Sequence, residues 1–360
     1  MSLTDANRAA LAAVRQRAER ERPRHVERIE RVLGGAGLRG RAESLLVSAG
    51  GAGSLTLNFH PDRLLSDGRS VAEGLHEEGV YRSQFETGVS SGALTAHPGG
   101  GRDVWERDLF SGAYQAPGAD VGARPKYGGL NLLNHLNGAC PGFGSCHLRL
   151  RAAAKQRATF VFGDSAAGPT EVGLIDSLEP VMAPVLERVE AEQRALGRDG
   201  IDVCAFVDGI LEAGFAPAMA AAHDDYVEAQ VHGVLSLPDD VEALVVDPAF
   251  AGTSTGELLV AAGERHGFEV DWHPGTTLDV SAVPDQAPDA GGALARWQEL
   301  CRDGRARRLA ERIVEEHGGE RRLDAANIGQ AAARAAGDPA ALQDLKDLWV
   351  LLVTYAASPR

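Results

Sequence analysis

Regular alternation of apolar and polar residues marks two segments that lie far apart in the chain. Residues 226–233 read Tyr-Val-Glu-Ala-Gln-Val-His-Gly, which predicts a strand with Glu228, Gln230 and His232 on one face. Such a row can be a solvated outer surface or a set of reactive groups on a rigid support. A second alternating segment, Ser-Leu-Thr-Leu-Asn-Phe-His, ends at His60, and this second histidine favours the reactive interpretation.

Helical periodicity dominates the two ends of the sequence. Residues 4–33 place apolar side chains at helical spacings, and Pro23 is expected to break or kink this helix. Its arginines interleave with glutamates, so we expect a salt-bridged solvent face rather than a nucleic-acid-binding arm. Two further helices are predicted over 175–197 and 201–221, and the chain reads as helical after residue 288.

The middle of the chain has the texture of short strands separated by Gly-rich loops. Strands are predicted at 158–163 and 242–247 in addition to the two alternating segments. We therefore expect an α+β protein. Its parts would be a helical N-terminal extension (1–44), a mixed-β catalytic core (45–285) and an α-helical C-terminal region (286–360).

Composition narrows the function classes. The formal net charge of −15 argues against a protein that wraps a phosphate backbone, because that role requires a basic surface. No apolar run reaches the roughly 18 residues of a membrane span, so no membrane partner is expected. The first residues lack a secretory pattern, and a cytoplasmic location is expected by default. Four scattered cysteines predict neither a disulfide framework nor a structural zinc site.

Two polar segments are candidates for binding a ligand. The segment from Tyr81 to Gly92 is rich in polar side chains and glycine, and ordering it without apolar burial is costly unless it shapes a ligand site. Tyr127 offers a flat ring that suits a planar heterocycle, although a core tyrosine fits equally well. The Gly-rich loops contain neither a P-loop nor a Rossmann fingerprint, so any nucleotide would bind in another way.

Six separated blocks, in chain order, carry a family resemblance. They are Leu-Asn-Phe-His-Pro-Asp-Arg, Tyr-Arg-Ser-Gln-Phe-Glu-Thr-Gly, Arg-Pro-Lys-Tyr-Gly, Gly-Ser-Cys-His-Leu-Arg, Phe-Gly-Asp-Ser and Tyr-Val-Glu-Ala-Gln-Val-His-Gly. Over about residues 45–280 they resemble a bacterial family defined as a domain of unknown function, number 3626. Several of these blocks are also similar to mono-ADP-ribosyltransferase domains of phages and bacterial toxins.

The second resemblance implies a split, strongly bent β-core of the ADP-ribosyltransferase type that grips NAD⁺ as a substrate and needs no metal. It implies a catalytic Glu228 that stabilises an oxocarbenium-like sugar, with His60 on a ribose and Tyr127 stacked on nicotinamide. Gln230 would position the acceptor, which can be a protein, a nucleic acid or a small molecule. The residues expected to bind NAD⁺ are Arg82, Ser83, Glu86, Thr87, Tyr127 and Gly128.

Alternatives remain open at the level of the sequence. Related transferases often place glycine after the first-strand histidine, whereas this chain has Pro61, which lacks an N–H group. Arg82 therefore competes with His60 for that role. A metal-dependent phosphodiesterase is an alternative function, with His60, Asp62, His97, His147 and Asp164 as ligands. A third is a non-catalytic interaction module that docks through Glu228, Gln230 and His232.

Overall fold

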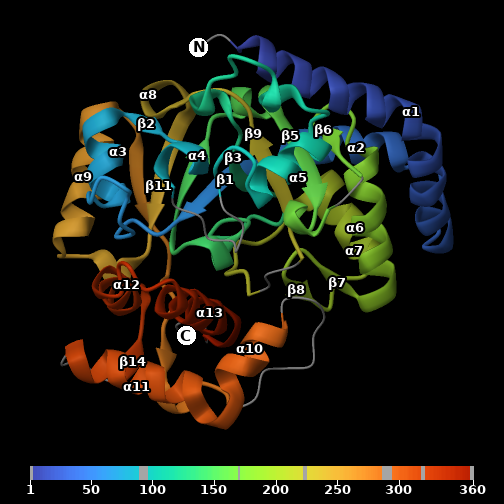
Figure 1. Cartoon of the computed structure of the whole chain (residues 1–360). Helices are drawn as coiled ribbons and strands as arrows, with labels where there is room; N and C mark the ends of the chain where they lie inside the picture. The colour runs from blue at the N-terminus through green and yellow to red at the C-terminus, as the bar shows by residue number, and fades with distance from the viewer. Residues whose placement is uncertain are drawn as a thin grey trace.

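A mixed sheet forms the centre of the protein (Figure 1), known here from a computed structural model that describes residues 3–88, 96–168, 171–221, 225–285, 294–317 and 321–356. Within these residues the largest sheet has eight strands in the order β12-β11-β4-β1-β3-β9-β5-β6. Neighbouring strands are antiparallel except for the parallel pair β11–β12. Their bounds are β1 Ser54–Phe59, β3 Lys126–Asn131, β4 Cys146–Leu150, β5 Ala158–Phe162, β6 Gly173–Leu174, β9 Val227–Val231, β11 Val241–Val246 and β12 Glu269–Trp272.

Helices surround this sheet, and the α+β class is confirmed. Their bounds are α1 Asp5–Gly35, α2 Ala42–Ala52, α3 Val71–Glu78, α4 Gln84–Thr87, α5 Gly101–Leu109, α6 Glu179–Glu192, α7 Val203–Asp208, α8 Leu237–Asp240, α9 Ser254–His266, α10 Leu294–Cys301, α11 Arg305–His317, α12 Ala325–Arg334 and α13 Pro339–Tyr355. Short strand pairs complete the chain: β2 Val80–Tyr81 with β10 Leu235–Ser236, β7 Arg194–Ala195 with β8 Arg198–Asp199, and β13 Leu278–Asp279 with β14 Arg322–Leu323.

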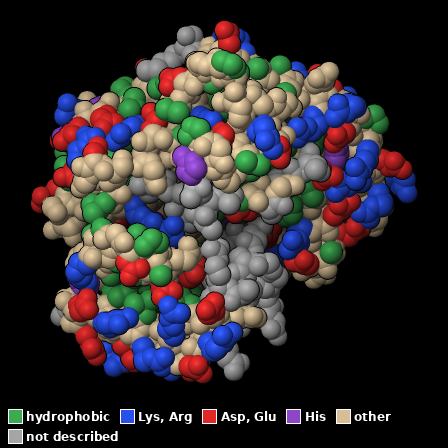
Figure 2. Space-filling view, in the orientation of Figure 1, with side chains coloured by type: hydrophobic (Ala, Val, Ile, Leu, Met, Phe, Trp, Pro, Cys, Tyr) green, Lys and Arg blue, Asp and Glu red, His purple; other side chains and the backbone are tan. Residues whose placement is uncertain are grey.

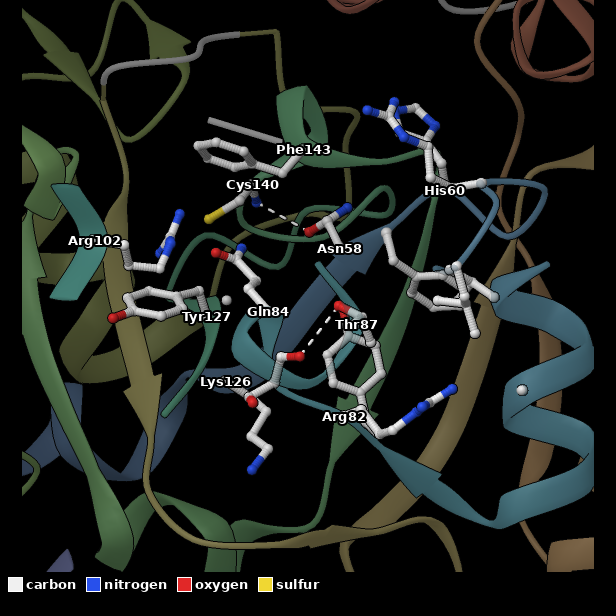
Figure 3. A pocket seen from close by; sticks show the side chains of 18 of the residues that line it. Asn58, His60, Arg82, Gln84, Thr87, Arg102, Lys126, Tyr127, Cys140 and Phe143 are labelled. Atoms are coloured by element: carbon white, nitrogen blue, oxygen red, sulfur yellow. Dashed lines mark hydrogen bonds between the residues drawn. The ribbon is translucent and has the colours of Figure 1, made fainter. Parts of the chain in front are cut away.

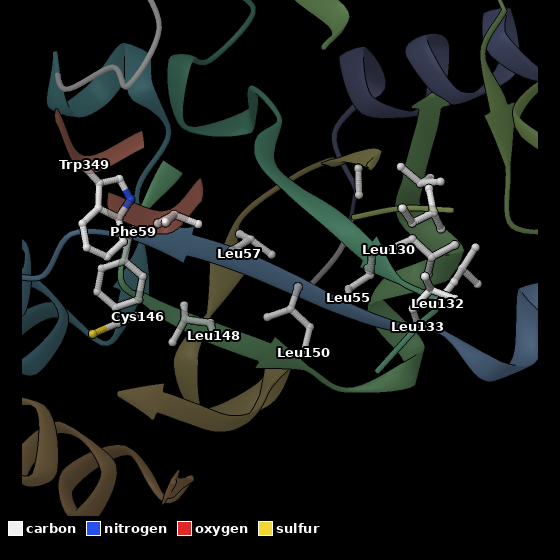
Figure 4. Close-up of a cluster of buried hydrophobic side chains, with 14 of the residues drawn as sticks. Leu55, Leu57, Phe59, Leu130, Leu132, Leu133, Cys146, Leu148, Leu150 and Trp349 are labelled. Atoms are coloured by element: carbon white, nitrogen blue, oxygen red, sulfur yellow. The ribbon is translucent and has the colours of Figure 1, made fainter. Parts of the chain in front are cut away.

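The two alternating segments are strands, as predicted, and β1 shows why the pattern is regular. Leu55, Leu57 and Phe59 point into the main core beside the apolar side chains of β4 (Figure 4). The intervening Thr56 and Asn58 point to the opposite face of the sheet. Burial of the apolar residues in the main core fixes the register, because a slip by one position would turn all of them away from that core. The polar face of β1 is thereby fixed as well.

The sheet splits between its two central strands. The β1–β3 ladder ends after the pair Thr56–Gly129, while β1 continues along β4 as far as Phe59. On the other side, β3 continues along β9 through Gly128 down to Lys126. The end of β1 and the beginning of β3 are therefore each paired on one side only within this sheet. This divergence leaves space for a cavity at the centre of the protein.

The N-terminal helix α1 lies on the outside of the fold (Figure 1) and packs against α6. Pro23 lies inside α1 and does not break it, because one helix runs from Asp5 to Gly35; of the two expected outcomes, a break or a kink, the break is wrong. Its arginines form ion pairs as predicted, but mainly with acids of another segment, for example Arg28 with Glu187 of α6 at 2.6 Å. Figure 2 shows basic and acidic side chains interspersed along this edge of the molecule. The arginines thus tie α1 to α6.

Two predicted helices are shorter than expected. The helix predicted over 175–197 is α6, which begins at Glu179 because Pro180 occupies the first turn, where a missing N–H is tolerated. It ends at Gln193, which adopts a left-handed conformation with φ 50°. The helix predicted over 201–221 consists of α7 and a π-helical turn that ends at Ala213.

The C-terminal helices pack against loops at one end of the sheet (Figure 1). The Trp349 indole N–H in α13 donates to the Pro141 carbonyl at 2.8 Å, and its ring lies edge-on to His60 with centroids 5.1 Å apart. β13 and β14 lie on opposite sides of the predicted boundary at 285 and pair with each other. One apolar cluster includes side chains from all three predicted parts of the chain.

A substitution at Gly128 tests how closely β3 approaches β1 at the point where the two strands separate. A Cβ atom at this position would lie 2.3 Å from the Thr56 carbonyl oxygen. We expect Gly128→Ala to lower the free energy of unfolding by about 1–3 kcal/mol, the usual cost of overpacking, in a urea titration. The control is Gly51→Ala in α2, where a Cβ meets nothing within 4 Å, and we expect it to stabilise by about 0.5–1 kcal/mol. Equal midpoints for Gly128→Ala and wild type would contradict the close approach.

Candidate functional site

A cavity of about 350 Å³ lies where β1 and β3 separate (Figure 3). Its walls come from the end of β1, the beginning of β3, the segment from Val80 to Thr87, and the loops that follow β3 and β5. Most of the predicted site residues line it, although they come from four distant parts of the sequence. These residues are His60, Arg82, Ser83, Thr87, Tyr127, Gly128 and Glu228.

Glu228 is the buried carboxylate of this cavity. Its side chain accepts a hydrogen bond from the Gln230 amide at 2.7 Å and one from the Ser165 backbone N–H at 3.3 Å. Burial raises the pKa of Glu228 to about 7, and the negative charge of Asp164 raises it further. The Glu228 carboxyl therefore titrates near neutral pH, at the edge of a cavity large enough for a ligand.

Gln230 does not line the cavity, so its predicted contact with an acceptor is not supported. It is fully buried beneath Glu228, where it donates to that carboxylate and accepts a hydrogen bond from the Thr159 hydroxyl at 2.7 Å. His232 continues the row and contacts Thr159 and the Tyr114 hydroxyl. Because Glu228, Gln230 and His232 are all buried, they cannot form the exposed docking strip of an interaction module.

Tyr127 presents its ring, and not its hydroxyl, to the cavity. The hydroxyl donates to the buried Glu106 carboxylate at 2.7 Å, and burial together with that charge raises the pKa of Tyr127 well above its ordinary value. The Arg102 guanidinium lies 4.8 Å from the centre of the Tyr127 ring and 4.4 Å from that of Trp105. The Tyr127 ring therefore lines the cavity, as the sequence predicted, and residues of α5 fix its position.

The segment around Arg82 is shaped by a helix cap. The Ser83 backbone N–H donates to the Glu86 carboxylate at 2.7 Å, and the Ser83 hydroxyl donates to the Val121 carbonyl at 3.1 Å. Glu86 is therefore a capping residue of α4 and not a cavity residue, contrary to the prediction. Arg82 lines the cavity but forms ion pairs with Glu78 at 3.0 Å and with Asp67 at 3.7 Å.

His60 lines another part of the cavity wall and directly follows the last residue of β1. Burial lowers its pKa to about 3, and the charges of Arg63 and Lys346 act in the same direction. The imidazole is therefore neutral at physiological pH and serves as a hydrogen-bonding group rather than as a cation. Both competing residues, His60 and Arg82, line the same cavity, so position alone does not choose between them.

Several cavity residues were absent from the predicted site. The Gln84 amide oxygen is buried and has no hydrogen-bond partner within the described part of the chain, and Figure 3 shows this side chain among the lining residues. Gln84 lies in the polar segment that was predicted to shape a ligand site, although it was not among the residues expected to bind NAD⁺. Arg63 follows His60 by three positions, within the same motif block. Arg102 gives no such signal, because its place depends on stacking over aromatic rings.

The metal-dependent alternative finds no support in the geometry. Across the described ranges, no group of three or more His, Cys, Asp or Glu side chains is arranged to hold a metal ion. His60 and Asp164 line the cavity, whereas His97 is exposed and His147 is buried in β4 without lining it. Asp62 packs against Gly329 of α12 instead. The five proposed ligands therefore do not converge.

Comparison with known families identifies the family to which the chain belongs. Residues 54–355 match the family described as protein of unknown function (DUF3626), and the chain belongs to this family. The match begins at the first residue of β1 and ends at the last residue of α13, so it extends well beyond the expected limit near 280 and includes the C-terminal helices. A search of curated proteins finds no match. Among the described helices, none has the length and apolar character needed to cross a membrane.

The Glu228 pKa tests the electrostatics of the cavity. We expect Asp164→Asn to lower this pKa, because removing one negative charge makes ionisation of the neighbouring carboxyl easier. A pH titration of ¹³C-labelled glutamate carboxyl signals by NMR measures the shift, with Glu228→Gln assigning the resonance. Asp108→Asn is the control, since Asp108 is an exposed carboxylate of α5 that does not line the cavity, and should leave the titration unchanged. An identical Glu228 midpoint in Asp164→Asn would refute the coupling.

Proposed function

We propose that this protein transfers the ADP-ribosyl group of NAD⁺ to an acceptor, and hydrolyses NAD⁺ when water takes the place of the acceptor. One observation carries the proposal: the buried carboxylate of Glu228 shares a cavity with the neutral imidazole of His60 and the ring of Tyr127. These are the three positions that the resemblance to ADP-ribosyltransferases selects. The split between β1 and β3 also supports the proposal, because it opens the sheet at these residues.

The reaction breaks one bond and forms one. The bond between the ribose C1′ and the nicotinamide nitrogen breaks, and its electron pair neutralises the pyridinium ring. The ribose becomes oxocarbenium-like until an acceptor heteroatom, or water, forms a new bond to C1′ and releases its proton to solvent. No oxidant or reductant takes part, so the site needs to stabilise a transient cation and to position two reactants.

Glu228 supplies the negative charge for this cation. A carboxylate in a low-dielectric site stabilises a nearby positive charge more strongly than one in water does. Gln230 and the Ser165 N–H hold both carboxylate oxygens, so the charge is fixed in place before the reaction. In this proposal Gln230 is a positioning residue that acts through Glu228. Ionised Glu228 is the reactive form, which requires a pH near or above its pKa of about 7.

The other cavity residues would hold the substrate. The Tyr127 ring, with the Arg102 guanidinium 4.8 Å from its centre, stacks on the nicotinamide. Neutral His60 hydrogen-bonds a ribose hydroxyl. Because Pro61 has no N–H to donate to the nicotinamide carboxamide, Gln84 holds the carboxamide by a different hydrogen bond, in which the carboxamide is the donor. The buried amide oxygen of Gln84 has no hydrogen-bond partner among the residues that the structure describes, and it accepts a hydrogen bond from the carboxamide NH₂ group.

Release of nicotinamide tests the central residue. We expect Glu228→Gln to reduce the rate at which purified protein releases nicotinamide from NAD⁺ by at least about a hundredfold, the effect of removing one charge that stabilises a transition state. Chromatography of free nicotinamide measures the rate at pH 8. The control variant is Glu242→Gln in β11, an exposed carboxylate outside the cavity, which should match wild type. Equal rates for Glu228→Gln and wild type would exclude the proposed role.

Recognition of the carboxamide tests Gln84 separately. The analogue of NAD⁺ that carries an acetyl group in place of the carboxamide lacks the NH₂ donor, so wild type should prefer NAD⁺. We expect Gln84→Ala to reduce this preference, expressed as a ratio of kcat/KM values, by about tenfold, the worth of one hydrogen bond to a buried acceptor. Gln16→Ala on the exposed face of α1 is the control. An unchanged ratio in Gln84→Ala would assign the carboxamide to another group.

A further inference from the structure

Arg63 occupies a fixed position at the edge of the cavity. It lies on the turn that follows β1, where its backbone N–H faces the His60 carbonyl at 3.4 Å and its carbonyl accepts from the Val71 N–H at 2.9 Å. The backbone is thus held from two sides, and the side chain lines the cavity. Its burial is partial, so a ligand in the cavity can reach it.

Of the described residues, four with cationic side chains line the cavity, and three of these contact other groups of the protein. Arg82 is paired with Glu78 and Asp67, and the Lys126 ammonium donates to the backbone carbonyls of Gly122, Arg124 and Gly233. The Arg102 guanidinium lies against the rings of Trp105 and Tyr127. These three groups have partners within the protein.

Arg63 has no such partner among the residues that the structure describes: neither an ion pair within 4.0 Å nor a side-chain hydrogen bond involves its guanidinium. The adjacent carboxylate of Asp62 packs against Gly329 of α12, where a Cβ atom would overlap it. Burial raises the pKa of Asp62 to about 7, which weakens its negative charge further. Burial lowers the pKa of Arg63, and the charge of Asp62 partly opposes this effect. Arginine nevertheless stays protonated in proteins, so the cavity wall carries a cation without an ion-pair partner among the described residues.

We infer that Arg63 is the phosphate-binding residue of this cavity and contacts the diphosphate of a nucleotide ligand. A guanidinium presents paired N–H groups that match phosphate oxygens, and a charge without a partner in the protein loses least when it binds an anion. Neutral His60 beside it contributes hydrogen bonds and no charge. Arg82, which was also expected to bind NAD⁺, is the weaker candidate for this contact, because its charge is already compensated by Glu78 and Asp67.

This inference deepens the proposed function, since NAD⁺ contains a diphosphate, but its test needs no catalysis. Isothermal titration calorimetry compares binding of ADP and adenosine to wild type, Arg63→Gln, Arg63→Lys and Arg82→Gln. We expect Arg63→Gln to weaken ADP binding by about 10–100-fold while adenosine binding stays unchanged. Arg63→Lys keeps the charge without the paired donors and should fall between wild type and Arg63→Gln. Arg82→Gln should weaken ADP binding less than Arg63→Gln does.

The control variant is Arg69→Gln, an arginine whose ion pairs with Asp67, Glu77 and Glu78 lie outside the cavity. Circular dichroism and the urea midpoint show whether each variant is folded. Equal ADP affinity in Arg63→Gln and wild type, a larger effect of Arg82→Gln, or no ADP binding by wild type would each overturn the inference. Loss of ADP affinity in Arg63→Gln together with no nicotinamide release by wild type would reject the proposed function and keep the phosphate site.

Discussion

The short ladder between β1 and β3 is the constraint on which the rest of the site depends. Three residue pairs join these strands before they separate, and each strand then relies on its outer neighbour, β4 or β9, for hydrogen bonds. The buried leucines of β1 fix which face its polar residues occupy. In most sheets, paired backbone fills the space between two central strands. Here a cavity takes that place, and side chains from both β1 and β3 line it.

Charge is distributed unevenly around this cavity. The groups that fix its walls are neutralised in place: the Arg124 guanidinium is paired with Asp103 and Glu106, and the latter in turn holds the Tyr127 hydroxyl. Glu228 and Arg63, in contrast, have no ion-pair partner among the described residues. Keeping a buried carboxylate without a cation beside it costs stability, which is typical of functional sites rather than of structural ones. The same contrast separates the supporting residues from those that can act on a ligand.

The sequence predicted a large part of this arrangement because period-two alternation reports directly on strand faces. It placed Glu228 and His60 on strands, and the structure brings both to one cavity with Tyr127 and Arg82. It did not predict that Gln230 lies below the surface, because alternation identifies a face without saying what covers it. Nor did it predict α5, where Arg102 and Trp105 meet Tyr127, since the buried face of this helix is mostly charged and gives no apolar pattern. Partners brought together by tertiary packing leave no local pattern to read.

The contact between Trp349 and the cavity loops has a consequence for biosynthesis. His60 belongs to the first sixth of the chain, whereas the indole that packs on it, and that binds the Pro141 carbonyl, lies in the last helix. During translation, therefore, the nascent polypeptide can form most of its sheet on the ribosome while the packing that supports His60 is still missing. His60 gains this packing partner only after α13 has emerged from the exit tunnel.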